Sequence, residues 1–414
     1  MRLSVPYGGG SLNVDLPGAD VQVIGAAELP AADEDDAIGR ALGSPVGARP
    51  LSEFLSGAGD AVVIVNDAKR PTPTARLLER IEAELAAVPN LTYLVATGTH
   101  RPPTSSEIER ILGGAARSRA ARVAVHDARD SSAMCYLGRT PLGTEVRVNR
   151  TVADASRVVA IGSVEPHYFA GFTGGRKAIV PGVAAYETVR QNHSHATHPG
   201  SQLMALRGNP VHEDMMEGLA LMGDREIFSV TTVLDASHRI CWAFAGDIRS
   251  TFDDAVERAR EIYCVTIEQK ADIVVCVTTS PSDSDLYQAH KAIESGKLAL
   301  ETGGILILVA ACREGLGSDA FVRQLAASHR PEDVASDIGA EYHLGDHKAV
   351  KLAELVMRAS VWTVTDLPDE TVRGIFFRPF HDLQTALDSA LAVKGPGARV
   401  LALMDAAVTV PSLR

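Results

Sequence analysis

The chain has 414 residues, which is two to three times a typical domain of about 100–200 residues, so we expect more than one folded unit. Apolar residues make up 46% of the sequence and charged residues 22%, a composition that supports a large buried core and excludes wholesale disorder. The formal net charge of −12 repels phosphate backbones and anionic lipid surfaces. We therefore expect neither nucleic acid nor a membrane as a partner.

The N-terminus and the cysteines bear on the cellular compartment. The residues after Met1 carry one positive charge and then glycines, where a secretion signal would need an apolar stretch of about 7–15 residues. The longest apolar runs, 271–277 and 303–312, are far shorter than the roughly 20 residues that span a bilayer. Five cysteines without a CxxC pair suit reduced thiols, so we expect a cytoplasmic protein.

The first half of the chain alternates between strand and helix patterns. After a hairpin pattern at 2–16, continuous apolar runs predict buried strands and amphipathic runs predict helices. The expected strands are 61–66, 91–96, 122–126, 145–149 and 157–161, and the expected helices are 74–87 and one that begins at 105. This alternation is typical of a parallel sheet covered by helices.

A second strand and helix series follows a long helix at 251–263. It consists of a strand at 271–278, a helix at 289–300 and a strand at 304–311. The sequence therefore predicts an α/β fold of two α/β domains with largely parallel sheets. We place the N-terminal domain at 1–266 and the C-terminal domain at 267–414, and a last strand at 399–404 could return to either domain.

Two polar loops directly follow predicted strands, where ligands of open α/β sheets bind. In the first, Pro71 holds the preceding Arg70 so that its guanidinium can meet a carboxylate or phosphate, while Asp67 orients a neighbour. In the second, small residues around Gly98 let backbone N–H groups approach an anion at a helix N-terminus, with His100 at the edge. Solvated turn residues and a structural histidine are the alternative interpretations.

A glycine-rich loop at 165–182 ends in Arg176 and Lys177. A Walker phosphate loop requires Gly, Lys and then Ser or Thr, so an ATPase loop is disfavoured. The interpretation that remains is a lysine whose glycine neighbours let a cofactor approach closely enough for a covalent bond, with His167 ten positions earlier.

Three histidines occur within six residues, at His193, His195 and His198. Imidazole groups of this kind are candidate ligands for zinc, nickel or copper, but the spacing matches no standard zinc motif. In the second half, the segment 285–291 follows a predicted strand and supplies hydrogen-bond donors and a cation. On its own it would be a polar helix start; together with the other loops it could close over a cleft.

Five segments, in this order along the chain, resemble the nickel-dependent lactate racemase family. They are Asp67-Ala68-Lys69-Arg70-Pro71, Gly98-Thr99-His100-Arg101, Glu165-Pro166-His167 leading into Gly174-Gly175-Arg176-Lys177, Asn192-His193-Ser194-His195, and Tyr287-Gln288-Ala289-His290-Lys291. The resemblance implies an active site in the cleft between the two domains.

The resemblance also implies a cofactor, the nickel pincer nucleotide, which is a pyridinium-3-thioamide-5-thiocarboxylic acid mononucleotide with bound nickel. Lys177 would tether it and His193 would bind the nickel. The remaining roles implied are acid/base catalysis by His100 and His167, substrate binding by Arg70, Gln288 and Lys291, and cofactor binding by Asp67 and Tyr287. His195 and His198 receive no role.

The implied reaction is racemisation of a short 2-hydroxy acid, with lactate as the default substrate. Removal of the Cα proton beside an ionised carboxylate is costly, whereas hydride transfer to the cofactor gives a planar 2-keto acid. One histidine takes the hydroxyl proton, and the second histidine serves the opposite enantiomer. An imidazole with a pKa near about 6.5 can exchange these roles at neutral pH.

Alternatives remain open from the sequence. The same chemistry on malate or another 2-hydroxy acid would need a second cation, for which Lys69, Arg101 and His290 are candidates. A zinc-dependent hydrolase would use His193, His195 and His198, and a non-catalytic nucleotide-binding protein would use the same loops. We expect a small 2-hydroxy acid and the proteins that make the cofactor as partners.

Overall fold

The computed structural model describes residues 1–27, 33–117, 121–317, 319–337, 342–395 and 397–414. The chain forms two compact units. We call the first the terminal unit, which comprises Met1–Ala27, Pro166–Tyr168 and Ile262–Arg414. The second, the central unit, comprises Glu28–Glu165 and Phe169–Glu261. The N-terminal residues thus group with the C-terminal part of the chain.

The central unit is built on a six-stranded sheet with the order β13-β12-β9-β4-β5-β6. Its strands are β4 (Asp60–Asn66), β5 (Asn90–Ala96), β6 (Ala121–Val125), β9 (Val158–Ser163), β12 (Ile227–Leu234) and β13 (Ile240–Asp247). Every neighbouring pair is parallel except β12 and β13, which are antiparallel. The carboxyl ends of β4, β5 and β9 therefore point the same way, and the loops that leave them meet at one edge of the sheet.

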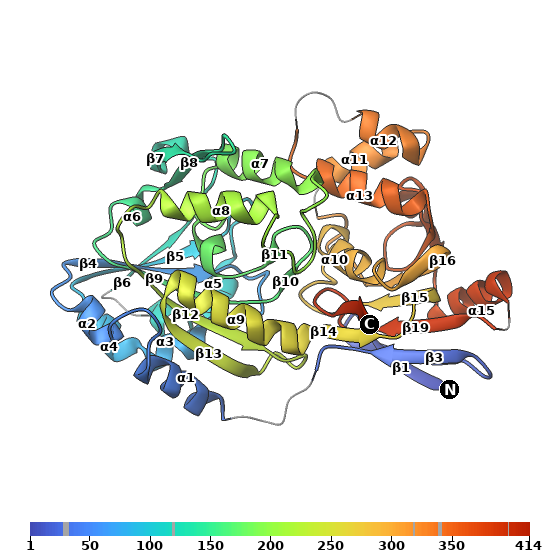
Figure 1. Cartoon of the computed structure of the whole chain (residues 1–414), viewed down its shortest axis with the longest axis horizontal. Coiled ribbons are helices and arrows are strands. Elements are labelled where there is room, and N and C mark those ends of the chain that lie inside the picture. The colour runs from blue at the N-terminus through green and yellow to red at the C-terminus, as the bar shows by residue number, and fades with distance from the viewer. Residues whose placement is uncertain (28–32, 118–120, 318, 338–341, 396) are drawn as a thin grey trace. The chain divides into compact units, whose positions relative to one another are not determined.

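Helices cover both sides of the central sheet, with α1 and α2 on one side and α7 and α8 on the other (Figure 1). The helices are α1 (Glu34–Gly43), α2 (Leu51–Leu55), α3 (Thr74–Arg80), α4 (Glu82–Ala86), α5 (Ser105–Leu112), α6 (Arg150–Ala153), α7 (Tyr186–Ser194), α8 (Pro210–Ala220) and α9 (Ile248–Tyr263). The expected single helix at 74–87 is wrong, because Ile81 leaves the helical conformation with φ −120° and ψ 9° and separates α3 from α4.

The expected strand at 145–149 does not join the central sheet. It is β8 (Glu145–Asn149), which forms an antiparallel hairpin with β7 (Met134–Arg139). Two short strands, β10 (Pro166–His167) and β11 (Gly171–Phe172), lie within the 165–182 segment, before Gly174 and Gly175. An antiparallel hairpin needs only a tight turn between its strands, so it can form outside a strand-helix-strand series.

The terminal unit has a second six-stranded sheet, with the order β18-β17-β16-β15-β19-β3 and every pair parallel. Its strands are β3 (Asp20–Ile24), β15 (Ala271–Val277), β16 (Leu300–Val309), β17 (Ser360–Val364), β18 (Arg378–Phe380) and β19 (Arg399–Leu403). The last predicted strand is β19, and it lies between β15 and β3. The predicted α/β fold with largely parallel sheets is thereby confirmed.

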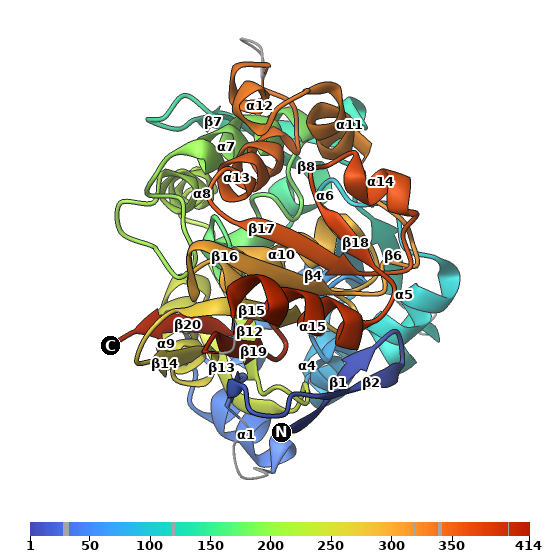
Figure 2. The same cartoon turned by 90° about the vertical axis from the view of Figure 1, so that its right-hand side faces the viewer.

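Both faces of the terminal sheet are buried. Along β15, Val274 and Cys276 join one apolar core, while Ile273 and Val275 join the core on the opposite face, as the two-residue period of a strand requires. The hairpin of β1 (Arg2–Tyr7) and β2 (Gly10–Asp15) packs into the second core. Figure 2 faces this unit, with α13 (Asp346–Val356) above the sheet and the hairpin below it.

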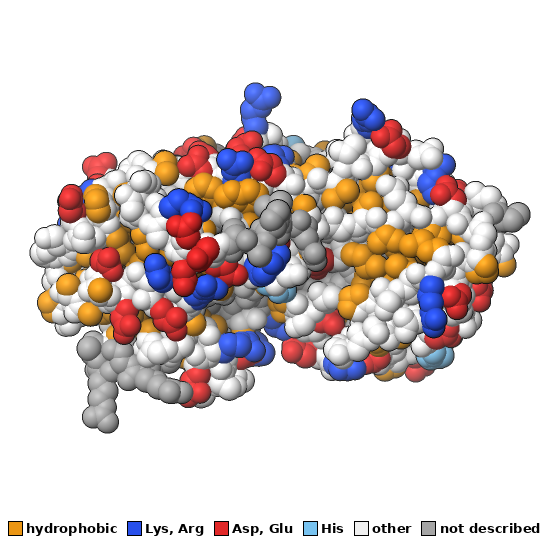
Figure 3. Space-filling model, turned by 90° about the horizontal axis from the view of Figure 1, so that it is seen from below, with side chains coloured by type: hydrophobic (Ala, Val, Ile, Leu, Met, Phe, Trp, Pro, Cys, Tyr) orange, Lys and Arg blue, Asp and Glu red, His pale blue; other side chains and the backbone are white. Residues whose placement is uncertain are grey.

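The remaining elements of the terminal unit complete these layers. They are α10 (Leu286–Gly296), α11 (Asp319–Ala327), α12 (Pro331–Asp337), α13 (Asp346–Val356), α14 (Asp369–Arg373), α15 (Leu383–Lys394), and the parallel pair of β14 (Cys264–Ile267) with β20 (Val410–Leu413). Among the described residues, no helix has the length and apolar character needed to cross a membrane. On the face drawn in Figure 3, the coloured Lys and Arg side chains lie among Asp and Glu and form no continuous basic patch.

Candidate functional site

The loops that leave β4 and β5 bring Asp67 and His100 together in the central unit. The Nδ1 atom of His100 lies 2.6 Å from Oδ2 of Asp67, whose side chain is buried. Burial alone would raise the pKa of Asp67, but the neighbouring His100 and Arg70 outweigh it and hold that pKa below its usual value. The carboxylate therefore stays ionised beside the imidazole.

The His100 loop also contacts the segment that follows Lys177. The backbone N–H of Gly98 donates to the carbonyl of Gly182 at 3.0 Å, and Gly98 has φ +54°, a conformation that favours glycine. A Cβ atom at Gly98 would lie 3.5 Å from the carbonyl oxygen of Pro181. That is an ordinary contact distance, so the backbone conformation, and not lack of space, is what favours glycine here.

A hydrogen-bonded chain that the sequence did not reveal links the ends of β4 and β9. Asn66 Nδ2 donates to Thr72 Oγ1 at 2.7 Å, and Thr72 Oγ1 lies 2.8 Å from Ser163 Oγ. Ser163 Oγ then donates to Glu165 Oε1 at 3.1 Å. These hydrogen bonds hold the loop that carries Arg70 against the strand that leads to the glycine-rich loop. In the sequence, the sign of this network is that Asn66 and Ser163 stand at the ends of strands.

Lys177 lies in a short 3₁₀ turn, Gly175–Ala178, and its side chain is largely buried, with Nζ 5.8 Å from the centre of the Phe169 ring. A Cβ at Gly174 would lie 2.7 Å from Val164 Cγ2, and one at Gly175 would lie 2.7 Å from Phe252 Cβ. The space left by these two glycines is thus filled by the protein's own atoms. The glycines shape the turn around the lysine and do not themselves leave room for a ligand.

Arg176 is buried beneath this loop and hydrogen-bonds to its backbone. Its guanidinium donates to the carbonyl oxygens of Ala170 at 2.7 Å and Gly174 at 3.2 Å and lies 4.4 Å from the centre of the Phe252 ring. Burial lowers the pKa of Arg176 to about 9, which still leaves it charged at neutral pH. Sequence reasoning treated this residue only as a departure from a phosphate loop, because arginine is rarely buried completely.

His193, near the end of α7, has a partner that determines which ring nitrogen carries a proton. Asn192 donates through Nδ2 to Asp214 Oδ2 at 2.8 Å and to the carbonyl of Val211 at 3.2 Å, so its Oδ1 is left as the acceptor. His193 Nδ1 lies 3.1 Å from that Oδ1. The Nδ1–H therefore donates, and Nε2 is the nitrogen that can bind a metal.

His195 and His198 do not form a metal site together with His193 among the described residues. His198 Nδ1 accepts from the backbone N–H of Gly200 at 3.0 Å. Within the described ranges, no group of three or more His, Cys, Asp or Glu side chains lies close enough to hold a metal ion. The three-histidine zinc site considered from the sequence is not formed by the described residues.

The terminal unit positions the residues expected around the start of α10. Asp285 caps this helix by accepting from the backbone N–H of Gln288 at 2.8 Å. Tyr287 and Lys291 are four residues apart and therefore lie on the same face of the helix. Burial raises the pKa of Tyr287 to about 12, so its phenol stays protonated.

His167 belongs to the terminal unit and is buried. Its ring stacks on that of Tyr168, with the centroids 5.2 Å apart and the planes 18° apart. The described structure thus presents the predicted site residues in two sets. The central unit holds Asp67, Arg70, His100, Lys177 and His193, and the terminal unit holds His167, Tyr287, Gln288 and Lys291.

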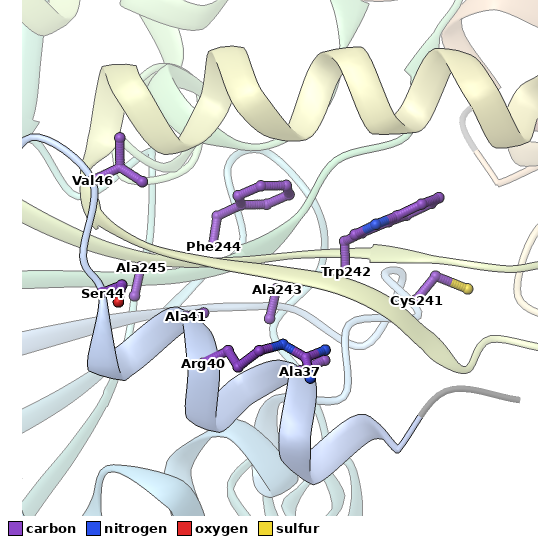
Figure 4. A pocket seen from close by; sticks show the side chains of 10 residues that line it. All are labelled: Ala37, Arg40, Ala41, Ser44, Val46, Cys241, Trp242, Ala243, Phe244 and Ala245. Carbon is purple, nitrogen blue, oxygen red and sulfur yellow. The ribbon is translucent and has the colours of Figure 1, made fainter.

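A pocket of about 220 Å³ elsewhere in the central unit contains none of the predicted site residues (Figure 4). It lies between α1 and β13, with Arg40 and Trp242 among its lining residues. Burial raises the pKa of Cys241, the thiol in its wall, to about 11, so that thiol is no activated nucleophile. The pocket offers no acid/base pair.

Comparison with known proteins identifies the family. Family models of the lactate racemase N-terminal and C-terminal domains match residues 7–204 and 266–410. The lactate racemase of Thermoanaerobacterium thermosaccharolyticum is 32% identical over 420 residues, which cover 98% of this chain and 97% of that protein. The lactate racemase of Lactiplantibacillus plantarum is 29% identical over 386 residues, which cover 90% of this chain and 89% of that protein.

Solved structures agree with these matches. The lactate racemase apoprotein of Thermoanaerobacterium thermosaccharolyticum superimposes with a TM-score of 0.90 and 32% identity over the whole of both chains. A Thermotoga maritima protein shares the fold at 16% identity, with a TM-score of 0.74 over 88% of this chain and 96% of that one. The fold and the matched domains define an isomerase of the racemase class. The chain belongs to the lactate racemase family, which confirms the resemblance found in its motifs.

Proposed function

We propose that the chain racemises a short 2-hydroxy acid, lactate by default, with a nickel pincer nucleotide tethered to Lys177. The observation that carries the proposal is the pair of Asp67 and His100, whose loop rests on the loop that follows Lys177. A buried carboxylate bonded to one nitrogen of an imidazole makes the other nitrogen a defined proton acceptor. Such a pair in a racemase fold suits acid/base chemistry at a tethered cofactor.

The residues present fit this cofactor. Lys177 is held in a turn that Arg176 and the glycines fix, and an amine on a rigid element can form a defined covalent bond. His193 offers Nε2 as one metal ligand, and the sulfur atoms of the cofactor would supply further ligands. When bound, the group would supply a hydride acceptor and donor.

The chain's own residues would move the protons and hold the substrate. His100, with Nδ1 bonded to Asp67, would take the hydroxyl proton of one enantiomer through Nε2. His167 would do the same for the other enantiomer, because the two enantiomers present their hydroxyl groups differently. Arg70 would hold the substrate carboxylate through its planar guanidinium while the rest of the molecule turns. We assign Gln288 and Lys291 to substrate binding and Tyr287 to cofactor binding.

Two observations favour a monocarboxylate substrate over malate. Arg101, one candidate for a second cation, donates to both carboxylate oxygens of Glu107 at 2.8 Å. His290, another candidate, is fully buried, and burial and the nearby Lys348 hold its pKa well below 6.5 and its ring uncharged. Lys69 is the remaining candidate of the three, so among them a second carboxylate would depend on Lys69 alone.

The test is a racemisation assay on holoenzyme produced together with the proteins that synthesise the cofactor, which are its proposed biosynthetic partners. Optical rotation of L-lactate should decay to zero, and the same assay over a panel of 2-hydroxy acids defines the substrate. With [2-²H]lactate in ordinary water, the product should retain deuterium at Cα, because hydride and not a proton leaves that carbon. Constant rotation across the panel, or complete loss of the deuterium, would refute the proposal.

A further inference from the structure

We propose that the first turn of α13, through His347 and Lys348, is a positioning element for His167 and Tyr287. The proposal rests on the proposed function, which assigns acid/base chemistry to His167 and cofactor binding to Tyr287. Nothing in the sequence motifs pointed to this turn. The turn contacts Tyr168 and Tyr287, which lie about 180 and 60 residues earlier in the chain.

His347 contacts Tyr168, the residue whose ring stacks on that of His167. His347 is fully buried, with Nε2 2.8 Å from the hydroxyl of Tyr168 and Nδ1 2.6 Å from that of Tyr342. Burial raises the pKa of Tyr168 well above 10, so its hydroxyl keeps a proton. Both ring nitrogens of His347 are therefore engaged by phenols, which fixes the Tyr168 ring on which His167 stacks.

Lys348 hydrogen-bonds to the backbone of Tyr287. The Nζ atom of Lys348 donates to the carbonyl oxygen of Tyr287 at 2.5 Å and lies 3.3 Å from the centre of its ring. The same Nζ atom lies 5.1 Å from the centre of the Tyr168 ring. One buried lysine side chain thus contacts both aromatic residues.

Gly345 and Asp346 shape the start of α13. Gly345 precedes α13 with φ +113°, and a Cβ there would lie 3.4 Å from Phe321 Cβ. Asp346 Oδ2 accepts from the backbone N–H of His343 at 2.6 Å, which closes the turn from the other side. His347 and Lys348 are 0% and 1% exposed, so they act through Tyr168 and Tyr287 and do not touch the substrate.

Kinetics of the holoenzyme with both lactate enantiomers test whether the hydrogen bonds of His347 position His167. His347→Leu removes both hydrogen bonds, and Tyr168→Phe removes only one hydroxyl and keeps the packing. Both variants should lower kcat about tenfold to a hundredfold with KM unchanged within about twofold, since small misplacement of a reacting group has effects of this size. His347→Gln, which can still donate and accept, should restore most of kcat. His381→Leu, at an exposed histidine elsewhere in the terminal unit, is the control and should change neither constant.

A readout on the protein without cofactor separates this inference from the proposed function. In NMR spectra of ¹³C,¹⁵N-histidine-labelled apoprotein, the His167 ring resonances, assigned with His167→Gln, should shift in Tyr168→Phe and His347→Leu. They should not shift in His381→Leu. Unmoved His167 resonances together with an unchanged kcat would overturn the positioning role. A wild-type holoenzyme that does not racemise any 2-hydroxy acid would overturn the proposed function, and the NMR comparison would still decide the role of His347.

Discussion

The Oδ2 atom of Asp67 lies 2.6 Å from Nδ1 of His100, at the ends of two neighbouring parallel strands. Asp67 is buried, whereas the His100 side chain is 31% exposed. One member of the pair is thus fixed within the protein and the other can meet a ligand. This asymmetry is what a base and its orienting carboxylate require.

Asp67→Asn should lower kcat for lactate racemisation about a hundredfold or more. The amide can accept or donate, so it no longer defines which nitrogen of His100 carries the proton. The measurement is the rate of optical rotation loss with holoenzyme of equal nickel content. Asp130→Asn, which changes an exposed capping carboxylate in the same unit, should leave the rate unchanged. Equal rates for Asp67→Asn and wild type would remove Asp67 from the mechanism.

Asn192→Leu should weaken nickel retention about tenfold to a hundredfold, because it removes the acceptor that orients His193. His195→Gln and His198→Gln should retain nickel as the wild type does. Nickel released to a chelator over time, measured by elemental analysis, checks both statements. If His195→Gln or His198→Gln loses nickel while Asn192→Leu keeps it, the assignment of the metal ligand to His193 is wrong.

Gly182→Ala should destabilise the loop around Lys177. Its Cβ would lie 2.5 Å from the carbonyl oxygen of Ala178 and 2.7 Å from that of Lys177, and relieving such contacts costs about 1–3 kcal/mol. We expect a lower Tm and a smaller fraction of chains that carry the cofactor. Gly59→Ala, whose Cβ would meet open space, is the control and should match the wild type in both measurements. A Gly182→Ala protein with wild-type Tm and loading would contradict the packing seen around this turn.

His212 should make the protein less stable in mild acid. Burial, and the nearby charge of Arg176, lower its pKa from 6.5 to about 3. The unfolded chain therefore binds the proton first, so stability is complete above about pH 6.5 and falls as the pH drops toward 3. His212→Phe should show a smaller difference in urea unfolding free energy between pH 7 and pH 5, whereas exposed His381→Gln should show the wild-type difference. A wild-type difference in His212→Phe would exclude this contribution.

The sequence predicted the strands that are buried on both faces. The apolar runs at 61–66 and 91–96 appear as β4 (Asp60–Asn66) and β5 (Asn90–Ala96), because such strands need apolar residues at every position. The order of strands could not be predicted. β3 pairs with β19, nearly 380 residues later, and no local pattern encodes that pairing.

For the candidate site, strand-exit loops were the useful signal and supporting residues were not visible. The sequence suggested that Asp67 orients a neighbour but did not say that the neighbour is His100. His347 and Lys348 lie in a helix start without a motif, and their importance depends on contacts with Tyr168 and Tyr287 that only the fold creates. Long-range contacts of this kind leave no spacing for a sequence to reveal.

The most direct test of the account is intact-mass analysis with nickel determination on protein made alongside the cofactor pathway. The wild-type chain should carry one added mass equal to the nickel nucleotide, located at Lys177 by peptide mapping, with one nickel per chain. Lys177→Ala should fold, show the unmodified mass and contain no nickel above background. An unmodified wild-type chain under these conditions, or an adduct that persists in Lys177→Ala, would contradict the central claim that Lys177 anchors the cofactor.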